Sequence, residues 1–232
     1  MPAKNIMKNK NNIAIIDYGM GNLFSVKLAC DYAGLNSIIT SDKHTIIKSN
    51  AVILPGVGAF GDAIDSLKRL DLISPIKDII ARKTDFLGIC LGLQLLMSES
   101  EEFGSFKGLD IIEGTVKKFP TESKTKYKVK VPQVGWNQIY YPEPHDISYW
   151  SNSPLKSISN AEYMYFVHSF YIKPSNKDII LTETTYENTK YCSGILKENI
   201  AAFQFHPEKS AIEGIKIYKD WANSLKTKKG MD

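Results

Sequence analysis

The chain has 232 residues, of which 43% are apolar and 23% charged, proportions typical of a globular protein with room for a substantial core. Its formal net charge of +4 comes from the ends: without residues 1–12 and 225–232 the chain carries 23 basic and 24 acidic side chains, which argues against nucleic-acid binding. No apolar run is long enough to span a membrane, no signal-peptide core is present, and three widely spaced cysteines do not form a disulfide framework, so we expect a cytoplasmic protein.

The first half of the chain alternates strands with helices, a pattern that predicts a mostly parallel sheet flanked by helices. Residues 1–12, rich in lysine and asparagine, are expected to form a disordered tail. We expect strands at 13–16, 37–40, 51–54 and 85–89, and helices at 23–33, 43–49, 60–70, 74–83 and 91–97. Sites in such sheets form beyond the carboxyl ends of the strands. The glycine-rich turns at 19–21 and 55–58 and the turn at Cys90 should therefore share one cleft.

The second half is strand-like, and short links such as 197–199 predict that several of its strands are antiparallel. The polar run at 98–103 is interpreted as a helix end and loop, and the last helix is expected at 212–224, followed by a tail at 225–232. Without repeats or linkers, residues 13–224 are predicted to form a single domain. The expected strands are 111–119, 127–131, 138–141, 163–171, 179–184, 191–196 and 201–205.

Four lysines alternate with other residues near one of these strands and give it a basic face: Lys124, Lys126, Lys128 and Lys130. Lysines commonly protect the edge strands of sheets from unwanted pairing, which is one interpretation. A surface for a phosphorylated ligand or an acidic partner is the other.

Residues 85–97 stand out because an apolar strand ends at a cysteine and turns directly into a helix. The segment Gly88-Ile89-Cys90-Leu91-Gly92 has the layout of a nucleophile elbow, in which a strained strand-to-helix turn presents the nucleophile. The start of the helix favours the thiolate, and the N–H of Leu91 can donate to an oxyanion. The simpler alternative is a buried cysteine packed between two glycines.

A thiol nucleophile needs a base, and His206 is the best placed of the four histidines. It ends a predicted buried strand and precedes Pro207, which disfavours the helical conformation at the residue before it. Residues two apart in an extended chain project to one side, so Glu208 can orient the imidazole and stabilise its protonated form. Cys90, His206 and Glu208 thus predict a nucleophile, a base and an orienting carboxylate. His168 lies in an apolar strand, where a hydrogen-bonded structural histidine is the simpler interpretation.

These motifs resemble those of the class I (triad) glutamine amidotransferases, through the segment around Cys90 with Gln94 and through Phe205-His206-Pro207-Glu208. Further segments are similar to those of one branch, the glutaminase subunits of imidazole glycerol phosphate synthase, and occur in the same order over residues 13–224. The resemblance implies the α/β fold of that class, with a mostly parallel central sheet, flanking helices and additional antiparallel strands in the second half. The segments are Asp17-Tyr18-Gly19-Met20-Gly21-Asn22, Pro55-Gly56-Val57-Gly58-Ala59-Phe60, Pro132-Gln133-Val134-Gly135-Trp136-Asn137, Tyr165-Phe166-Val167-His168-Ser169 and His206-Pro207-Glu208-Lys209-Ser210.

The resemblance implies a glutaminase that hydrolyses L-glutamine to glutamate and ammonia without a metal or organic cofactor. In that chemistry Cys90 attacks the side-chain amide, His206 moves protons and Glu208 orients it. The ammonia then passes to a (βα)8-barrel cyclase in a heterodimer, which makes imidazole glycerol phosphate and AICAR in histidine biosynthesis. The other matching positions are Leu91, Val57 and Gly58 for the oxyanion, Gln94, His168 and Ser169 for the substrate, and Asn22, Trp136, Asn137 and Lys209 for the partner.

Three features depart from the pattern of that branch: Gln133 replaces a frequent histidine, and the runs at 98–103 and 163–166 differ from its usual residues. They resemble a paralogous branch, in which the glutaminase supplies ammonia to an ATP-dependent sugar amidotransferase in surface-glycan biosynthesis. Two further alternatives are a stand-alone γ-glutamyl hydrolase or cysteine peptidase on the same fold, and an inactive interaction subunit. None of the departures touches the three catalytic positions, so they leave the ammonia acceptor open.

Overall fold

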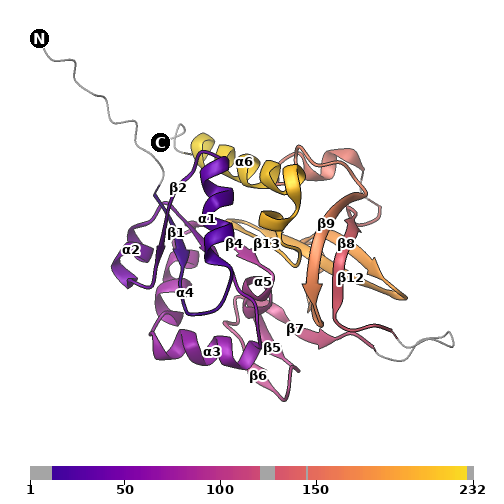
Figure 1. Cartoon of the computed structure of the whole chain (residues 1–232), viewed down its shortest axis with the longest axis horizontal. Coiled ribbons are helices and arrows are strands. Elements are labelled where there is room, and N and C mark those ends of the chain that lie inside the picture. Colours follow the sequence, from indigo (N-terminus) through magenta and orange to yellow (C-terminus); the bar gives the residue numbers. More distant parts are fainter. Residues whose placement is uncertain (1–11, 121–128, 145, 229–232) are drawn as a thin grey trace, which may run out of the picture.

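The computed structural model describes residues 12–120, 129–144 and 146–228, and a long central sheet runs through the molecule (Figure 1). The parallel part of the sheet has the order β2-β1-β3-β4-β13. Four of these strands, β1, β3, β4 and β13, are apolar and largely buried, as expected for parallel strands with helices on both faces, whereas the edge strand β2 is partly exposed. They are β1 (Asn12–Ile16), β2 (Asn36–Thr40), β3 (Ala51–Leu54), β4 (Asp85–Ile89) and β13 (Ile200–Phe203).

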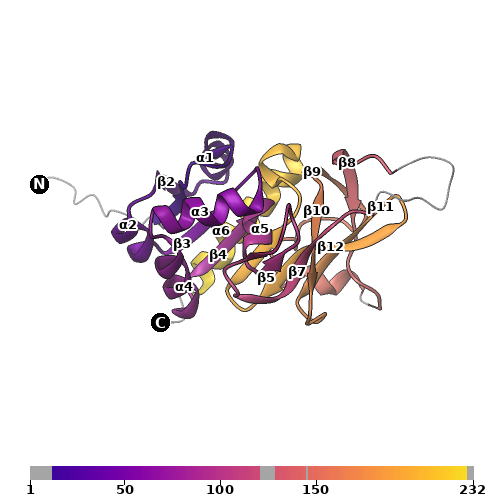
Figure 2. The same ribbon diagram turned by 90° about the horizontal axis from the view of Figure 1, so that it is seen from below.

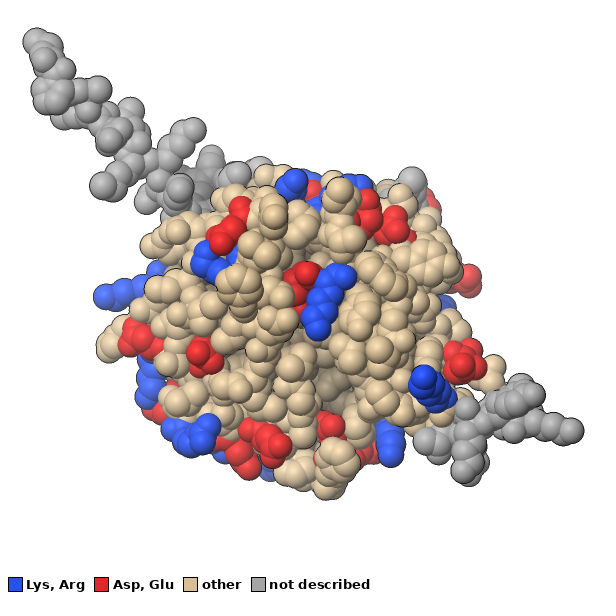
Figure 3. Space-filling model, viewed as in Figure 1, with Lys and Arg blue, Asp and Glu red and all other residues tan. Residues whose placement is uncertain are grey.

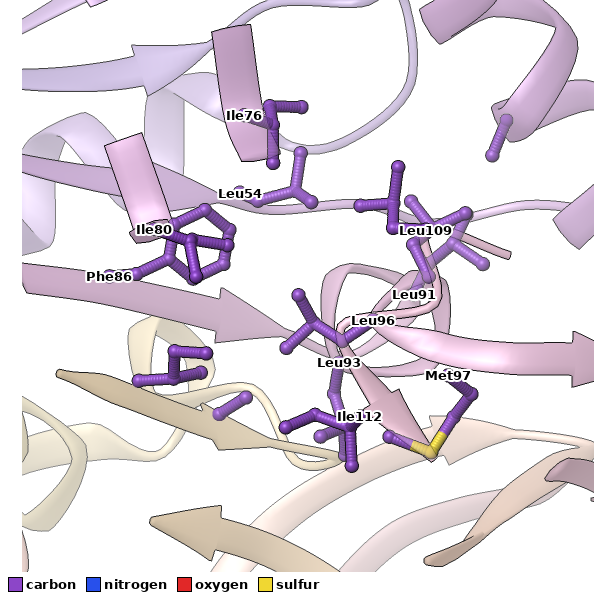
Figure 4. Close-up of a cluster of buried hydrophobic side chains, with 14 of the residues drawn as sticks. Leu54, Ile76, Ile80, Phe86, Leu91, Leu93, Leu96, Met97, Leu109 and Ile112 are labelled. Atoms are coloured by element: carbon purple, nitrogen blue, oxygen red, sulfur yellow. The ribbon is translucent and has the colours of Figure 1, made fainter. Parts of the chain in front are cut away.

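Helices cover both faces of this parallel part, as Figures 1 and 2 show. One face carries α1 (Leu23–Tyr32) and α6 (Ala211–Lys228). The other carries α2 (Lys43–Lys48), α3 (Phe60–Arg69), α4 (Ile73–Ala81) and α5 (Leu91–Leu95). Strand residues alternate between the two cores: Ile15 packs with α1 and α6, whereas Ile16 packs with α3 and α4. Figure 4 shows the second core around α5, where Leu93 and Leu96 lie near Phe86 of β4.

The second half of the chain extends the sheet mainly with antiparallel strands, which confirms the predicted fold class. Beyond β13 come β12 (Thr189–Lys197), β10 (Phe170–Pro174), β7 (Ile112–Lys118), β5 (Met97–Ser100) and β6 (Phe106–Lys107), and β11 (Ile180–Tyr186) pairs with β12. β8 (Gln133–Ile139) and β9 (Glu162–His168) form a separate two-stranded sheet. Two short 3-10 helices complete the fold, η1 (Ile147–Trp150) and η2 (Pro207–Lys209).

The prediction for 98–103 was wrong, because this segment contains most of β5. Its main chain pairs with β7 on one side and β6 on the other, and this pairing outweighs the polar character of the side chains. Two of the polar residues are buried, Ser100 and Glu102. Glu102 Oε2 accepts the first main-chain N–H of α3, from Phe60, at 2.8 Å, so this carboxylate caps that helix.

Several element boundaries also differ from the predictions, and three of these differences affect the site. The helix after the cysteine ends at Leu95 instead of residue 97. The strand predicted at 163–171 is split at Ser169 into β9 and β10, which belong to different sheets. β8 begins at Gln133, five residues before the predicted start, so Trp136 and Asn137 lie in a strand.

The predictions for the ends and for the lysine-rich stretch fall largely outside the described residues. This holds for the tail at 1–12, except for Asn12, which begins β1. The strand predicted at 127–131 was wrong for residues 129–131, which are described and lie outside any strand; of the lysines on its predicted basic face, only Lys130 is described. α6 continues four residues past its predicted end, with Leu225 buried. The single domain over 13–224 stays a prediction.

The surface shown in Figure 3 carries acidic and basic side chains interspersed, and neither sign gathers into one large patch on that face. Within the part of the chain that the structure describes, no helix combines the length and apolar character needed to cross a membrane.

Candidate active site

Cys90 lies on a strained turn between β4 and α5, with φ 54° and ψ −107°. Close packing explains both glycines of its motif. A Cβ on Gly92 would lie 1.8 Å from the carbonyl oxygen of Leu54, and one on Gly88 would lie 2.9 Å from a side-chain atom of β13. The N–H of Cys90 donates to the carbonyl of Phe203 at 2.7 Å, which ties the turn to that strand. The helix that follows the cysteine, α5, has only five residues.

The predicted base and its orienting carboxylate are in contact, with His206 Nδ1 2.7 Å from Glu208 Oε1 and both side chains 2% exposed. The local argument for this contact was wrong, because Glu208 lies on the 3-10 turn η2 and not in an extended chain. Burial disfavours the charged imidazole, but the negative charges of Cys90 and Glu208 outweigh burial and raise the pKa of His206 to about 10. His206 is therefore protonated at physiological pH and can stabilise negative charge on a neighbouring nucleophile.

The main chain around Tyr165 of β9 holds this turn in place. Its carbonyl accepts the N–H of His206 at 2.9 Å, and its N–H donates to Ser210 Oγ at 2.9 Å. Ser210 Oγ in turn donates to the carbonyl of His206 at 2.7 Å. The histidine backbone is thus fixed by β9 and by the residue that ends η2.

Gln204 is a site residue that the sequence interpretation missed. Its side chain is fully buried, and its amide Nε2 lies 3.6 Å from Cys90 Sγ as a hydrogen-bond donor. Its Oε1 accepts from Gln94 Nε2 at 3.1 Å, and the same nitrogen donates to the carbonyl of Phe170 at 3.0 Å. The signal in the sequence was a polar side chain inside the apolar strand 201–205, where burial requires hydrogen-bond partners.

The predicted oxyanion donor is engaged within the protein. The N–H of Leu91 donates to the carbonyl of Gly56 at 3.3 Å, so in this arrangement it cannot donate to a substrate. Tyr18 Oη holds the same loop by donating to the carbonyl of Pro55 at 2.9 Å. The oxyanion role of Leu91, Val57 and Gly58 therefore stays a prediction, which needs a different arrangement of this loop. Freeing Leu91 requires the peptide between Gly56 and Val57 to turn.

A cleft of about 440 Å³ opens in front of Cys90 at the carboxyl edge of the sheet. It brings the 55–58 loop and the cysteine turn together, as predicted, but the 19–21 turn lines a different hollow against α3. Of the predicted site residues, Asn22, Trp136, Asn137, His206 and Glu208 do not line the cleft. Its walls are formed by Val57, Gly58, Cys90, Leu91, Gln94, Glu102, Pro132, Val167, His168, Ser169, Phe170 and Lys209.

The side chain of His168 serves the core, which agrees with its interpretation from the strand alone. Nδ1 lies 2.8 Å from the carbonyl of Phe170, and Nε2 lies 3.2 Å from the hydroxyl of Tyr191, which also bonds Gln133 Oε1 at 3.0 Å. Burial lowers the pKa of His168 to about 4, so the ring is neutral at physiological pH. Gln133, which stands where the family often has histidine, is therefore a buried hydrogen-bond partner of Tyr191 and does not line the cleft.

Two of the predicted partner-facing residues gather around Tyr165. The Trp136 ring, 53% exposed, meets the Tyr165 ring edge-on with centroids 6.0 Å apart, and Lys209 Nζ lies 5.8 Å from the centroid of the same ring. Asn22 is exposed at the start of α1, where its side chain caps the helix through the N–H of Ser25. Asn137 is turned inward, and its amide donates to the carbonyl of Thr185 at 2.9 Å.

Comparison with known proteins gives a consistent result for sequence and fold. The family model described as Glutamine amidotransferase class-I matches residues 14–222. The chain is similar to the imidazole glycerol phosphate synthase subunit HisH of Geobacter metallireducens, with 39% identity over 213 residues, 91% of this chain and 98% of the relative. The HisH subunit of Syntrophotalea carbinolica is 41% identical over 212 residues, 91% and 99% of the two chains.

Solved structures agree at the level of the fold. PurLQS from Thermotoga maritima superposes with a TM-score of 0.67 at 16% identity, covering 94% of this chain and 99% of that chain. A crystal structure described as a glutamine amidotransferase gives a TM-score of 0.67 at 12% identity, covering 92% and 98%. At such low identity the likeness concerns the fold alone.

Proposed function

Because this chain belongs to the class I glutamine amidotransferases, and within them to the HisH subunits of imidazole glycerol phosphate synthase, we propose that it is the glutaminase that supplies ammonia to that enzyme in histidine biosynthesis. One observation carries the chemistry: Cys90, on its strained turn, opens on a cleft and acts electrostatically on a hydrogen-bonded pair, His206 and Glu208.

In the proposed reaction, Cys90 Sγ attacks the side-chain amide carbon of L-glutamine, and ammonia leaves with a proton from His206. Water then attacks the thioester while His206 takes a proton from it, which releases glutamate and restores the thiol. Glu208 Oε1 keeps the ring oriented through Nδ1 in both steps. Gln204 donates to the sulfur and Gln94 lines the cleft, so we assign them to holding the nucleophile and the substrate.

The oxyanion of both steps needs a donor that the described state does not offer. Turning the peptide between Gly56 and Val57 removes the carbonyl from Leu91 and brings the N–H of Val57 toward the same space. Losing one such donor typically costs a factor of about 10² to 10³ in kcat. We therefore expect low activity from the isolated chain and strong stimulation by whatever turns this peptide.

We assign that role to a (βα)8-barrel cyclase that forms a heterodimer with this chain in the cytoplasm. The surface that suits it contains an exposed indole that meets one tyrosine ring edge-on and an ammonium group near the same ring, with Trp136, Tyr165 and Lys209 as its residues. Tryptophan, tyrosine and cationic side chains of this kind often dominate interfaces. Lys209 also lines the cleft, so the proposed partner surface and the substrate site meet at this residue.

The test is the release of glutamate from glutamine, measured for the chain alone and with the organism's own histidine-pathway cyclase plus its nucleotide ligand. We expect strong stimulation, and we expect Cys90→Ala to abolish turnover while it still binds the cyclase. A wild-type chain with a reactive Cys90 but no stimulation would contradict the pathway and favour the sugar-modifying partner. Turnover of γ-glutamyl peptides without any partner would favour the stand-alone hydrolase instead.

A further inference from the structure

Tyr218 of α6 is fully buried, in the apolar core that α6 shares with α1. α6 approaches η2 so closely that a Cβ on Gly214 would lie 1.8 Å from the carbonyl oxygen of Pro207. Tyr218 lies four residues after Gly214, on the same face of the helix. The close contact at Gly214 therefore directs the tyrosine toward the turn that carries the triad carboxylate.

Two oxygen atoms in this region are buried without a hydrogen-bond partner among the described residues, Glu208 Oε2 and Tyr218 Oη. Buried polar atoms are nearly always paired, so two unpaired oxygens on elements that contact each other, η2 and α6, need an explanation. The other carboxylate oxygen, Oε1, is already committed to His206. After burial, the charge of Glu208 is the largest influence that raises the pKa of Tyr218, so the two groups interact electrostatically.

Cys30 of α1 is the other ionisable group that acts on Tyr218. Burial raises the pKa of its thiol to about 12, so it is neutral at physiological pH. A neutral thiol accepts hydrogen bonds weakly, whereas a carboxylate oxygen accepts them strongly. Glu208 Oε2 is thus the stronger acceptor available to this hydroxyl.

We propose that the Tyr218 hydroxyl donates a hydrogen bond to Glu208 Oε2 when the triad is active and so acts as a positioning residue behind the carboxylate. With Oε2 held from α6, Oε1 stays on His206 Nδ1 and the ring keeps its second nitrogen, Nε2, toward the cysteine. Tyr218 contacts neither substrate nor sulfur, and its effect passes through Glu208. The inference rests on the proposed glutaminase triad, which it extends by one residue.

The experiment compares the wild type with Tyr218→Phe, which removes the hydroxyl and keeps the ring, in the complex with the cyclase. We expect kcat to fall about tenfold, as for loss of a hydrogen bond to a charged group, with KM for glutamine unchanged. The melting temperature should not fall, because the lost hydroxyl has no partner in the resting state. Tyr149→Phe is the matched control: it removes a hydroxyl that bonds the carbonyl of Ile180, outside the triad, and should leave kcat unchanged.

Repeating the Tyr218→Phe substitution in an enzyme that lacks the Glu208 carboxylate separates an effect through Glu208 from an effect on core packing. If Tyr218 acts through Glu208, the phenylalanine substitution changes kcat less than about twofold in a Glu208→Ala background. A tenfold loss that persists there, or a Tyr218→Phe enzyme with wild-type kcat, overturns the proposal.

Alkylation of Cys90 by iodoacetamide gives a readout that needs no substrate, followed by mass spectrometry of the Cys90 peptide. We expect Tyr218→Phe to slow it about threefold or more, because a loosened Glu208 supports the imidazolium and thiolate less well. A wild-type chain that alkylates but hydrolyses no glutamine even in the complex with the cyclase refutes the proposed function. The alkylation rates then still decide the role of Tyr218, since an unchanged rate contradicts it.

Discussion

Replacing Gly56 by alanine tests how tightly the loop beside the cleft is held. A Cβ at this position would lie 2.1 Å from Tyr18 Oη and 3.0 Å from Leu91 Cβ. Ordinary contact begins near 3.4 Å, so the loop or the tyrosine must move by about 1.3 Å. Tyr18 has little freedom to do so, because it is fully buried and its hydroxyl donates to the carbonyl of Pro55.

Two terms set the expected loss of stability. Overpacking a buried position costs about 1–3 kcal/mol, and breaking the Tyr18–Pro55 hydrogen bond costs about 1 kcal/mol more. We therefore expect Gly56→Ala to lower the free energy of unfolding by about 2–4 kcal/mol, measured by urea denaturation with an unchanged m value. A loss below about 0.5 kcal/mol would show that the loop yields easily and would refute the reasoning.

Tyr18→Phe provides the matched second variant. By itself it leaves the buried carbonyl of Pro55 without its donor, at a cost of about 1–3 kcal/mol. In the double variant with Gly56→Ala, the new methyl group occupies space that the hydroxyl has left. The combined loss should therefore fall short of the sum of the single losses by at least about 1 kcal/mol. Additive losses would mean that the alanine clashes elsewhere.

Two further predictions concern the site. Gln204→Leu nearly keeps the size of the side chain but removes the donor to Cys90 Sγ. We expect kcat to fall about tenfold at saturating glutamine and the alkylation of Cys90 to slow. Unchanged rates would contradict a role of Gln204 at the sulfur. The pKa of His206 is raised from 6.5 to about 10, so its contribution to stability is complete below pH 6.5 and is lost as the pH rises through 10. Urea titrations of the wild type and His206→Gln at about pH 6 and about pH 10 should show a smaller difference in unfolding free energy at the higher pH, and a larger one would contradict the sign.

The nucleophile turn and its histidine were predictable because each depends on local chemistry. A backbone that doubles back at Cys90 needs glycines on both sides, and the contacts of Gly88 and Gly92 show why. The partner of His206 was predicted correctly from a wrong local geometry. A side chain two residues away reaches the ring from a 3-10 turn as well as from an extended chain, so the spacing did not distinguish them.

Other features depend on interactions that no local pattern records. The orientation of the peptide after Gly56 is one of them, since it decides whether Leu91 is free and leaves no mark on residue identity. Gln204 reaches Cys90 only because β13 pairs with β4, which sets the residues that follow the two strands next to each other. The strand at 97–100 was hidden because its side chains are mostly polar, whereas its stability comes from main-chain pairing on both sides.

The strand β9 brings the outer surface and the reactive centre within two residues of each other. The ring of Tyr165 lies with Trp136 and Lys209 on the surface, while its carbonyl holds the main chain of His206. Two residues on, the carbonyl of Val167 lies 3.9 Å from Cys90 Sγ. A single strand thus contacts the surface group of Trp136 and Lys209, the main chain of the base and the sulfur of the nucleophile. A partner that binds at Tyr165 would therefore touch the element that also holds both reactive groups.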